Sequence, residues 1–352
     1  MKNLKRVIGV LTIIFFQQVC SAQIDVRQGS YIDNFLDFVI VNSANDIRLQ
    51  RTYTSRSVDK GWFGWGWCSN LEVHLNIHSQ SSLDYIDCQL EVSFQLHKNG
   101  QWFSADYKEM SLKKEGLNYF VTHMNGTVYV FNNRGKLQKI IDRANRRLSL
   151  SYYKSLLQGN ENIQFENQQG FKVHLQFNSE QLIHKVKIMA PKGLAIYRYK
   201  EMLRPKNWTF SYSYTEGSLT EVKAETKLIY HYTYTKDKNL NKIDNEFGQQ
   251  KTIFYDQQND WVTRIVDFDG CIETMKYWFH PQIPQNNYRS QYLKSCDGKV
   301  IKAGNFEFTY EMHPLMGRYL KSLQMSNGKK IKSIEFNPLT GRPVERNVSN
   351  HF

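Results

Sequence analysis

The stretch Tyr230-His231-Tyr232-Thr233-Tyr234 alternates tyrosines with polar residues, and Leu240, Ile243 and Asp244 follow it. A period of two is typical of a β-strand with one buried face, and aromatic residues favour such a pleated surface. The same order recurs upstream, in residues 210–222, and downstream, in residues 253–267. The equivalent aliphatic residues Leu219, Leu240 and Val262 are 21 and 22 residues apart. A spacing this regular indicates a repeat architecture.

Each repeat reads as a strand, a turn and a second strand, with aromatic residues on one face. Such a unit cannot bury its apolar face alone and must stack on its neighbours. Another unit lies at residues 126–152, and weaker copies lie at residues 173–199 and 306–336. We therefore expect an all-β protein in which residues 126–345 form one antiparallel repeat sheet, and we expect helix to be a minor component.

The region before the repeats has its own strand pattern. Residues 47–55 alternate strictly, and the run Gly61-Trp62-Phe63-Gly64-Trp65-Gly66-Trp67 follows. Glycines between aromatic residues predict a sharp bend, because only glycine adopts a positive φ cheaply. We assign residues 23–125 to a small N-terminal β domain.

The composition limits the class of protein. The chain has 352 residues, of which 41% are hydrophobic and 22% charged, which excludes a disordered chain and a polytopic membrane protein. The 21 Tyr and 21 Phe against 7 Pro favour strands. The formal net charge of +13 favours an anionic surface or polysaccharide as a partner. Lysines and arginines are dispersed, which argues against nucleic acid.

The first 22 residues predict export. Lys2, Lys5 and Arg6 precede the apolar run of residues 7–16, and Cys20-Ser21-Ala22 places small residues before Gln23. This order is typical of a cleaved secretory signal. An uncleaved anchor is the alternative, although the run is shorter than the ~20 residues a spanning helix needs. We expect a secreted, periplasmic or cell-surface protein with no transmembrane segment after cleavage.

Four cysteines remain after such cleavage. In an oxidising compartment an even number favours disulfides, and three connectivities exist. We predict Cys68–Cys88 and Cys271–Cys296, because each pair closes a short loop within one segment. A zinc site that uses His280 between Cys271 and Cys296 is the alternative, but the spacing matches no Cys-x-x-Cys zinc site.

The repeats resemble those of the RHS/YD-repeat family: an aromatic strand, a glycine turn, Leu followed three residues later by Ile or Val, and an Asp–Gly turn. The N-terminal motif of that family is also similar to residues in this chain, namely Arg51, Tyr53, Ser55, Gly61, Phe63, Gly64, Gly66 and Trp67. The resemblance extends over most of residues 25–345. It implies a long sheet curled into a shell, which encloses a C-terminal toxin in bacterial members and supports adhesion in animal relatives.

This chain departs from the family in two respects. Its repeats are few enough that we expect only a partial shell, followed by a short tail at residues 346–352 and by no toxin domain. The family's self-cleavage segment contains Asp-Pro, a dipeptide missing from this sequence. Residues 337–343 resemble a turn that ends the repeats. We therefore do not expect self-proteolysis.

Few residues suggest chemistry. Arg51 shares a strand face with Leu49 and Tyr53, so we expect it to be partly buried and paired with a carboxylate or several carbonyls. Asp267-Phe268-Asp269-Gly270 is interpreted as a turn rather than a calcium loop. We predict no catalytic residue, no metal and no cofactor. One group of rings is interpreted as a ladder between repeats, with a sugar-binding face as the alternative: Tyr212, Tyr214, Tyr232, Tyr234 and Tyr255.

These features predict a non-enzymatic scaffold at the cell surface or in the periplasm. An open sheet leaves edge strands, which a protein partner or a second copy can extend. The alternative is a delivery component, or a truncated relic, of a polymorphic toxin system. A polysaccharide-active enzyme ranks lowest, because no paired carboxylates form a readable motif.

Overall fold

All regular structure in the described part of the chain is β-strand. The computed structural model describes residues 23–26, 28–40, 47–88, 90–104, 109–154, 161–191, 196–198, 201–203, 208–279, 287–314, 317–327, 330–337 and 343–350. The expected signal at residues 1–22, His280 and most of the expected terminal turn at 337–343 lie outside these ranges. Within them, no helix has the length and hydropathy needed to cross a bilayer.

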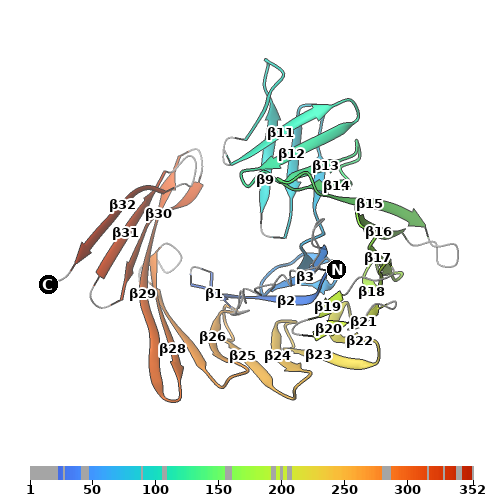
Figure 1. Cartoon of the computed structure of the whole chain (residues 1–352). Coiled ribbons are helices and arrows are strands. Elements are labelled where there is room, and N and C mark those ends of the chain that lie inside the picture. The colour runs from blue at the N-terminus through green and yellow to red at the C-terminus, as the bar shows by residue number, and fades with distance from the viewer. Residues whose placement is uncertain are drawn as a thin grey trace, which may run out of the picture.

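One large antiparallel sheet contains twenty strands and dominates the fold. Figure 1 shows this sheet curling through an open arc from β11 to β32. In order, its strands are β11 (Met110–Glu115), β12 (Asn118–His123), β13 (Val128–Phe131), β14 (Leu137–Ile141), β15 (Arg147–Lys154), β16 (Glu161–Asn167), β17 (Lys172–Phe177), β18 (Ile183–Met189), β21 (Trp208–Thr215), β22 (Ser218–Ala224), β23 (Lys227–Tyr234), β24 (Leu240–Asn245), β25 (Gln250–Tyr255), β26 (Val262–Val266), β27 (Ile272–Phe279), β28 (Asn287–Cys296), β29 (Lys299–His313), β30 (Gly317–Ser326), β31 (Lys330–Phe336) and β32 (Pro343–Asn350).

Three smaller sheets accompany the large one. We call the first the N-terminal layer; it comprises β1 (Gln23–Asp25), β2 (Ser30–Ile40), β3 (Ile47–Thr54), β6 (Trp67–Ser69), β19 (Ile196–Arg198) and β20 (Glu201–Leu203). The others are a pair, β4 (Lys60–Gly61) and β5 (Gly64–Trp65), and a four-stranded sheet of β7 (His74–Ile77), β8 (Ser82–Ile86), β9 (Glu91–Leu96) and β10 (Trp102–Phe103). In Figure 1, β2 and β3 lie inside the curve of the large sheet.

The same β-bulge recurs in successive hairpins and explains the curl. In the hairpin of β23 and β24, Thr233 pairs with Lys242 but Tyr234 pairs with Leu240, so Asn241 is an extra residue. A bulge bends the sheet and increases its twist. Repetition of one bulge at one position therefore bends every unit in the same sense. The aromatic–aliphatic pairs that mark the equivalent bulges are Phe131–Leu137, Phe177–Ile183, Tyr214–Leu219, Tyr255–Val262 and Tyr310–Leu320.

Tyrosine hydroxyls connect several repeat units to the unit before them. The hydroxyl of Tyr234 donates to the carbonyl oxygen of Leu219 at 2.7 Å, and that of Tyr255 donates to the carbonyl of Leu240 at 2.8 Å. Tyr152, Tyr214 and Tyr277 make the equivalent bonds to Leu137, Ile183 and Val262. Leu219, Leu240 and Val262, whose spacing indicated the repeat, thus occupy equivalent positions.

The boundaries differ from those expected. The large sheet begins at β11, before residue 126, because β11 and β12 pair with β13 in the same ladder. Residues 196–198 were expected to belong to a repeat, but Tyr197 pairs with Val39 in the N-terminal layer. Most of the expected tail at 346–352 belongs to β32, which pairs with β31.

Both predicted disulfides are confirmed. Cys68 is bonded to Cys88 and Cys271 to Cys296, with Cα atoms 5.5 Å and 4.3 Å apart. The zinc alternative at Cys271 and Cys296 is therefore wrong, because a disulfide leaves no thiolate to bind the metal. No group of residues that could hold a metal ion is present in the described ranges.

Candidate functional site

The contact between the N-terminal layer and the concave face of the large sheet contains four buried charged residues: Asp33, Asp37, Arg51 and Lys251. Strand β2 directs Tyr31, Asp33, Phe35 and Asp37 to one face, because alternate residues of a strand share a face. All four are at most 4% exposed. Two carboxylates are thus buried among rings, and each has a cation beside it.

Arg51 is fully buried and pairs with Asp37, as its position on the strand predicted. Its Nη2 lies 2.7 Å from Oδ1 of Asp37 and its Nε lies 2.8 Å from Oδ2, which is a two-pronged contact. Tyr212 donates to the same carboxylate at 2.8 Å, and the guanidinium donates to the hydroxyl of Tyr232. The large sheet therefore completes the ion pair.

Aromatic rings surround the Arg51 guanidinium. Its Cζ lies between 5.0 and 5.8 Å from the ring centres of Phe35, Phe63, Trp67, Tyr212 and Tyr232. Burial by itself lowers the pKa of Arg51, but Asp37 and Tyr232 more than offset it, so the pKa is raised and the group stays charged. Arg51 therefore holds β2, β3 and the repeats together. Its guanidinium has no exposed face that could contact a substrate.

The other motif residues hold the N-terminal layer against the hairpin bulges. The hydroxyl of Tyr53 accepts the N–H of Leu240, and Nε1 of Trp67 donates to the hydroxyl of Tyr234 at 3.0 Å. Ser55 accepts the N–H of Tyr31 at 2.8 Å. Phe63 is buried with its ring 5.0 Å from that of Tyr212.

The glycine bend places backbone against backbone. Gly64 has a φ of 101°, and a Cβ there would lie 2.3 Å from the carbonyl oxygen of Gly217. The N–H of the next residue, Trp65, donates to that same oxygen at 3.2 Å. A Cβ at Gly61 would lie 2.1 Å from the carbonyl oxygen of Trp67, and Gly66 has a φ of 75°. The glycines are therefore needed for close approach and for backbone conformation.

Glu72 closes this bend and was not singled out from the sequence. Its carboxylate accepts the N–H of Trp62 at 2.9 Å and the N–H of Ser69 at 3.2 Å. Burial raises the pKa of Glu72 to about 7, although the two backbone hydrogen bonds act in the opposite direction. The group therefore titrates near neutral pH.

The five tyrosines considered as a sugar-binding face point into the fold. Tyr212 and Tyr232 are 4% and 1% exposed, and Tyr214, Tyr234 and Tyr255 are half-buried against the core. Burial raises the pKa of all five, so their hydroxyls remain hydrogen-bond donors. Because these rings pack against the core, the geometry favours the ladder interpretation over a sugar-binding face.

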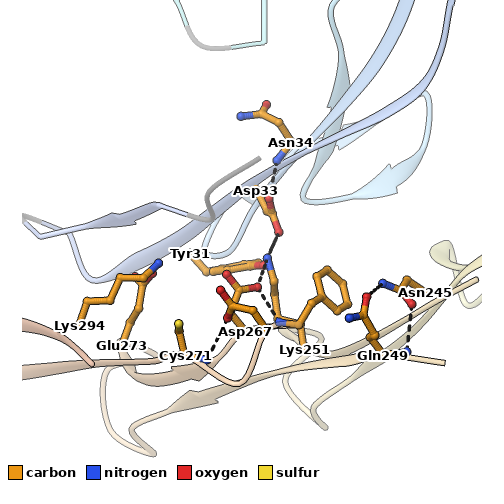
Figure 2. Close-up of polar contacts among 12 residues, drawn as sticks. Tyr31, Asp33, Asn34, Asn245, Gln249, Lys251, Asp267, Cys271, Glu273 and Lys294 are labelled. Atoms are coloured by element: carbon orange, nitrogen blue, oxygen red, sulfur yellow. Dashed lines mark hydrogen bonds and ion pairs between the residues drawn. The ribbon is translucent and has the colours of Figure 1, made fainter. Parts of the chain in front are cut away.

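A second buried charge cluster joins β2 to β25 (Figure 2). Nζ of Lys251 lies 2.9 Å from Oδ2 of Asp33 and 3.1 Å from Oδ1 of Asp267. The hydroxyl of Tyr31 donates to Oδ2 of Asp33 at 2.6 Å, and the N–H of Asn34 donates to Oδ1 at 2.9 Å. The side chains of Lys251 and Asp33 are only 2% and 3% exposed.

The protonation of this cluster follows from its charges. Burial lowers the pKa of Lys251, but the carboxylates of Asp33 and Asp267 more than offset it, so the pKa is raised. Burial and Asp33 raise the pKa of Tyr31 well above its usual value, which keeps its hydroxyl protonated. Asp267 also belongs to the predicted turn, since the N–H of Gly270 donates to its carbonyl oxygen at 2.9 Å.

Part of the chain is similar to a known protein family, and the chain also has low similarity to several solved structures. Residues 21–93 match the family described as Domain of unknown function (DUF6531). No curated protein matches the chain in sequence.

Solved structures with similarity include TcdB2-TccC3-TEV (8% identity, TM-score 0.19, 97% of this chain) and a Tc holotoxin pore of Photorhabdus luminescens (9%, 0.20, 88%). The chain spans 28% and 22% of their lengths. A third is the N-terminal domain of the effector protein SpvB from Salmonella typhimurium strain LT2, at 11% identity and TM-score 0.18, with 90% of this chain and 98% of that one covered. Likeness at these scores carries no conclusion about function.

Proposed function

We propose that this chain is an exported, non-enzymatic scaffold of the RHS/YD-repeat type that binds a protein partner at the C-terminal end of its sheet. The observation that carries the proposal is an apolar face, next to an edge strand, that the described residues leave only half-buried. The recurrent bulge and the DUF6531 match at residues 21–93 support the family assignment.

The uncovered face continues the surface on which the N-terminal layer lies. Trp261 contacts the N-terminal layer at Gly29, and its ring lies 5.6 Å from that of Tyr288, which stacks on Phe308 at 4.8 Å. Phe308 pairs with Leu323, and Leu323 with Ile334, so these residues share one face. Leu323 and Ile334 are only half-buried. The same interface is therefore incomplete over β29–β31.

The edge strand lies beside this face. Among the described strands, β32 pairs only with β31, so its other side presents backbone donors and acceptors. Such an edge accepts a strand from another chain through main-chain hydrogen bonds. We propose a protein partner that adds a strand to β32 and covers Leu323 and Ile334.

A photo-crosslinking residue at Leu323 tests this docking surface in the exporting cell. Gln324 is the matched control, because the next residue of a strand points to the opposite face and Gln324 is exposed. We expect a specific crosslinked product from position 323 and none from position 324. Equal labelling at both positions, or none at either, would contradict the proposal.

A pair of proline variants tests the edge. Adjacent residues of an edge strand direct their N–H groups to opposite sides, so Arg346→Pro and Asn347→Pro each remove a different one. We expect one of the two to abolish the crosslink at position 323 without changing thermal stability. Light scattering of the purified chain shows whether the partner is a second copy. A strict monomer that yields no crosslinked product in cells would refute the docking site.

Export is supported by the two disulfides, which persist in oxidising compartments. We expect the chain in the periplasm, in the medium or on the cell surface, with Gln23 as its first residue after signal cleavage. Cell fractionation with N-terminal sequencing checks this. Recovery in the cytoplasm with reduced cysteines would contradict it.

The net charge of +13 supports an anionic polysaccharide as an additional ligand. We expect the chain to bind an acidic polysaccharide with an affinity that falls steeply as salt is added. A neutral polysaccharide should not bind.

The other proposed function is a delivery component or a relic of a polymorphic toxin system, and the neighbouring genes test it. A toxin or immunity gene beside this one would favour it.

A further inference from the structure

Lys251 sits in an unusual place for a lysine, because its amine is enclosed between two carboxylates. Oδ2 of Asp33 and Oδ1 of Asp267 lie 2.9 Å and 3.1 Å from Nζ. The ring of Phe268 has its centre 5.0 Å from Nζ. In Figure 2 the three charged side chains converge from β2, β25 and the turn after β26.

We propose that Lys251 and Asp33 form an intramolecular amide bond that fastens β2 covalently to β25. Nζ of Lys251 attacks Cγ of Asp33, a Cγ–N bond forms and one Cγ–O bond breaks. The oxygen leaves as water with two protons from the ammonium group. The reaction changes no oxidation state and consumes no co-reactant.

Asp267 is the group that takes a proton from Lys251. The amine must lose its proton before it can attack, and Asp267 lies within hydrogen-bond distance of Nζ. Its side chain is 17% exposed, against 3% for Asp33, so it can exchange that proton with solvent. This difference in exposure assigns Asp267 as the base and Asp33 as the carboxyl that is attacked.

Two donors stabilise the oxygens of Asp33 during the attack. The hydroxyl of Tyr31 bonds to Oδ2, and the N–H of Asn34 bonds to Oδ1. Attack on Cγ places negative charge on these oxygens, and fixed donors aimed at such charge lower the barrier. Tyr31 can also pass a proton to the departing oxygen.

Position and burial favour the product. Reacting groups held in contact gain a large effective concentration, and a buried site removes the water that would reverse the reaction. The ion pair of Lys294 and Glu273 is a useful comparison within the same chain. Its Nζ–Oε1 distance is also short, at 2.8 Å, but the lysine side chain is 20% exposed. We expect this second pair to remain ionic.

The test is the mass of the full chain purified from the exporting cell. We expect a mass lower by one water molecule than that of the cleaved chain with its two disulfides. Protease digestion should yield one branched peptide that joins the segment around Asp33 to the segment around Lys251. Lys294 and Glu273 should appear in separate, unmodified peptides.

Three variants assign the roles. Lys251→Arg keeps the positive charge and should restore the full mass. Asp267→Asn should leave the chain folded, by circular dichroism, but slow or abolish the loss of water. Tyr31→Phe should slow it less. A folded wild-type chain with the full mass and separate peptides would overturn the proposal. A water lost within the Asp33 peptide alone, as in a succinimide, would overturn it as well.

Discussion

The hydroxyl of Tyr53 accepts a hydrogen bond from the backbone N–H of Leu240 at 2.9 Å, although 187 positions separate them. Leu240 precedes Asn241, the extra residue of the bulge in its hairpin, and its N–H bonds to Tyr53. Its carbonyl oxygen accepts the hydroxyl of Tyr255. Both backbone groups of Leu240 are thus satisfied from outside the hairpin, as buried polar groups require.

The same rule holds at neighbouring bulges. The N–H of Ile183 donates to the carbonyl of Trp62 at 2.8 Å, and the N–H of Val262 donates to that of Gly29 at 2.8 Å. The N-terminal layer and the adjacent turn between β4 and β5 therefore supply acceptors to units of the sheet. Removing these segments would leave those donors unpaired.

Arg51→Met should lower the free energy of unfolding by about 3 to 5 kcal/mol, because it leaves the buried carboxylate of Asp37 without its cation. The double variant Arg51→Met with Asp37→Leu should recover part of that loss, since no buried charge remains. Urea denaturation of the three proteins measures both effects. A single variant within about 1 kcal/mol of the wild type would show that the pair is not buried as described.

Tyr234→Phe should destabilise the protein by about 1 to 3 kcal/mol. The hydroxyl donates to Leu219 and accepts from Trp67, so its loss leaves two groups unpaired. Tyr153→Phe is the matched control, because Tyr153 is 37% exposed. The control should change stability by no more than about 0.5 kcal/mol. Equal losses in the two variants would argue against the tyrosine ladder.

Gly64→Ala should cost well over the ~1 kcal/mol of an ordinary glycine at positive φ. The added Cβ would collide with the carbonyl oxygen of Gly217 and push the bend away from the repeats. Gly100→Ala controls for conformation alone, because Gly100 also has a positive φ, 81°, but no atom within 4 Å of the added Cβ. Thermal melting should place Gly64→Ala clearly below Gly100→Ala, and the reverse order would be incompatible with the contact.

Glu72 should make stability depend on pH between its ordinary pKa of 4.5 and its folded pKa of about 7. The fold favours the protonated carboxyl, so its contribution is fully present below pH 4.5 and is lost as the pH rises to 7. The loss amounts to roughly 3 kcal/mol. Glu72→Gln cannot ionise, so the difference in unfolding free energy between the two proteins should change across this window. A constant difference would mean that the carboxyl of Glu72 titrates normally.

The repeat sheet could be predicted because its signals are local. Alternation around Tyr232 and the spacing of Leu219, Leu240 and Val262 reflect the pleat and the bulge, which depend on residues close in sequence. The burial of Arg51 was also predictable, since Leu49 and Tyr53 identify its strand face. The two disulfides were predicted from short loop lengths.

The charge partners could not be predicted in the same way. Asp37, 14 residues from Arg51, meets it through the pairing of β2 with β3, whereas only the path of the curled sheet brings Lys251 to Asp33, 218 residues away. A usable signal did exist in β2, where Asp33 and Asp37 alternate in phase with Tyr31 and Phe35. Carboxylates in phase with buried rings indicate buried ion pairs. No comparable sequence pattern indicated that residues 196–203 belong to the same sheet as β2.

The uneven anchoring of the hairpins limits how such a chain can gain or lose units by gene duplication. Between Leu137 and Val262, different N-terminal residues are matched to particular bulges, so an inserted copy would shift every later match. Further along, Ser290 in β28 donates to the carbonyl of Val26, and the apolar face over β29–β31 is only half-buried. Copy number can therefore change at the C-terminal end of the arc, where relatives should differ most in length.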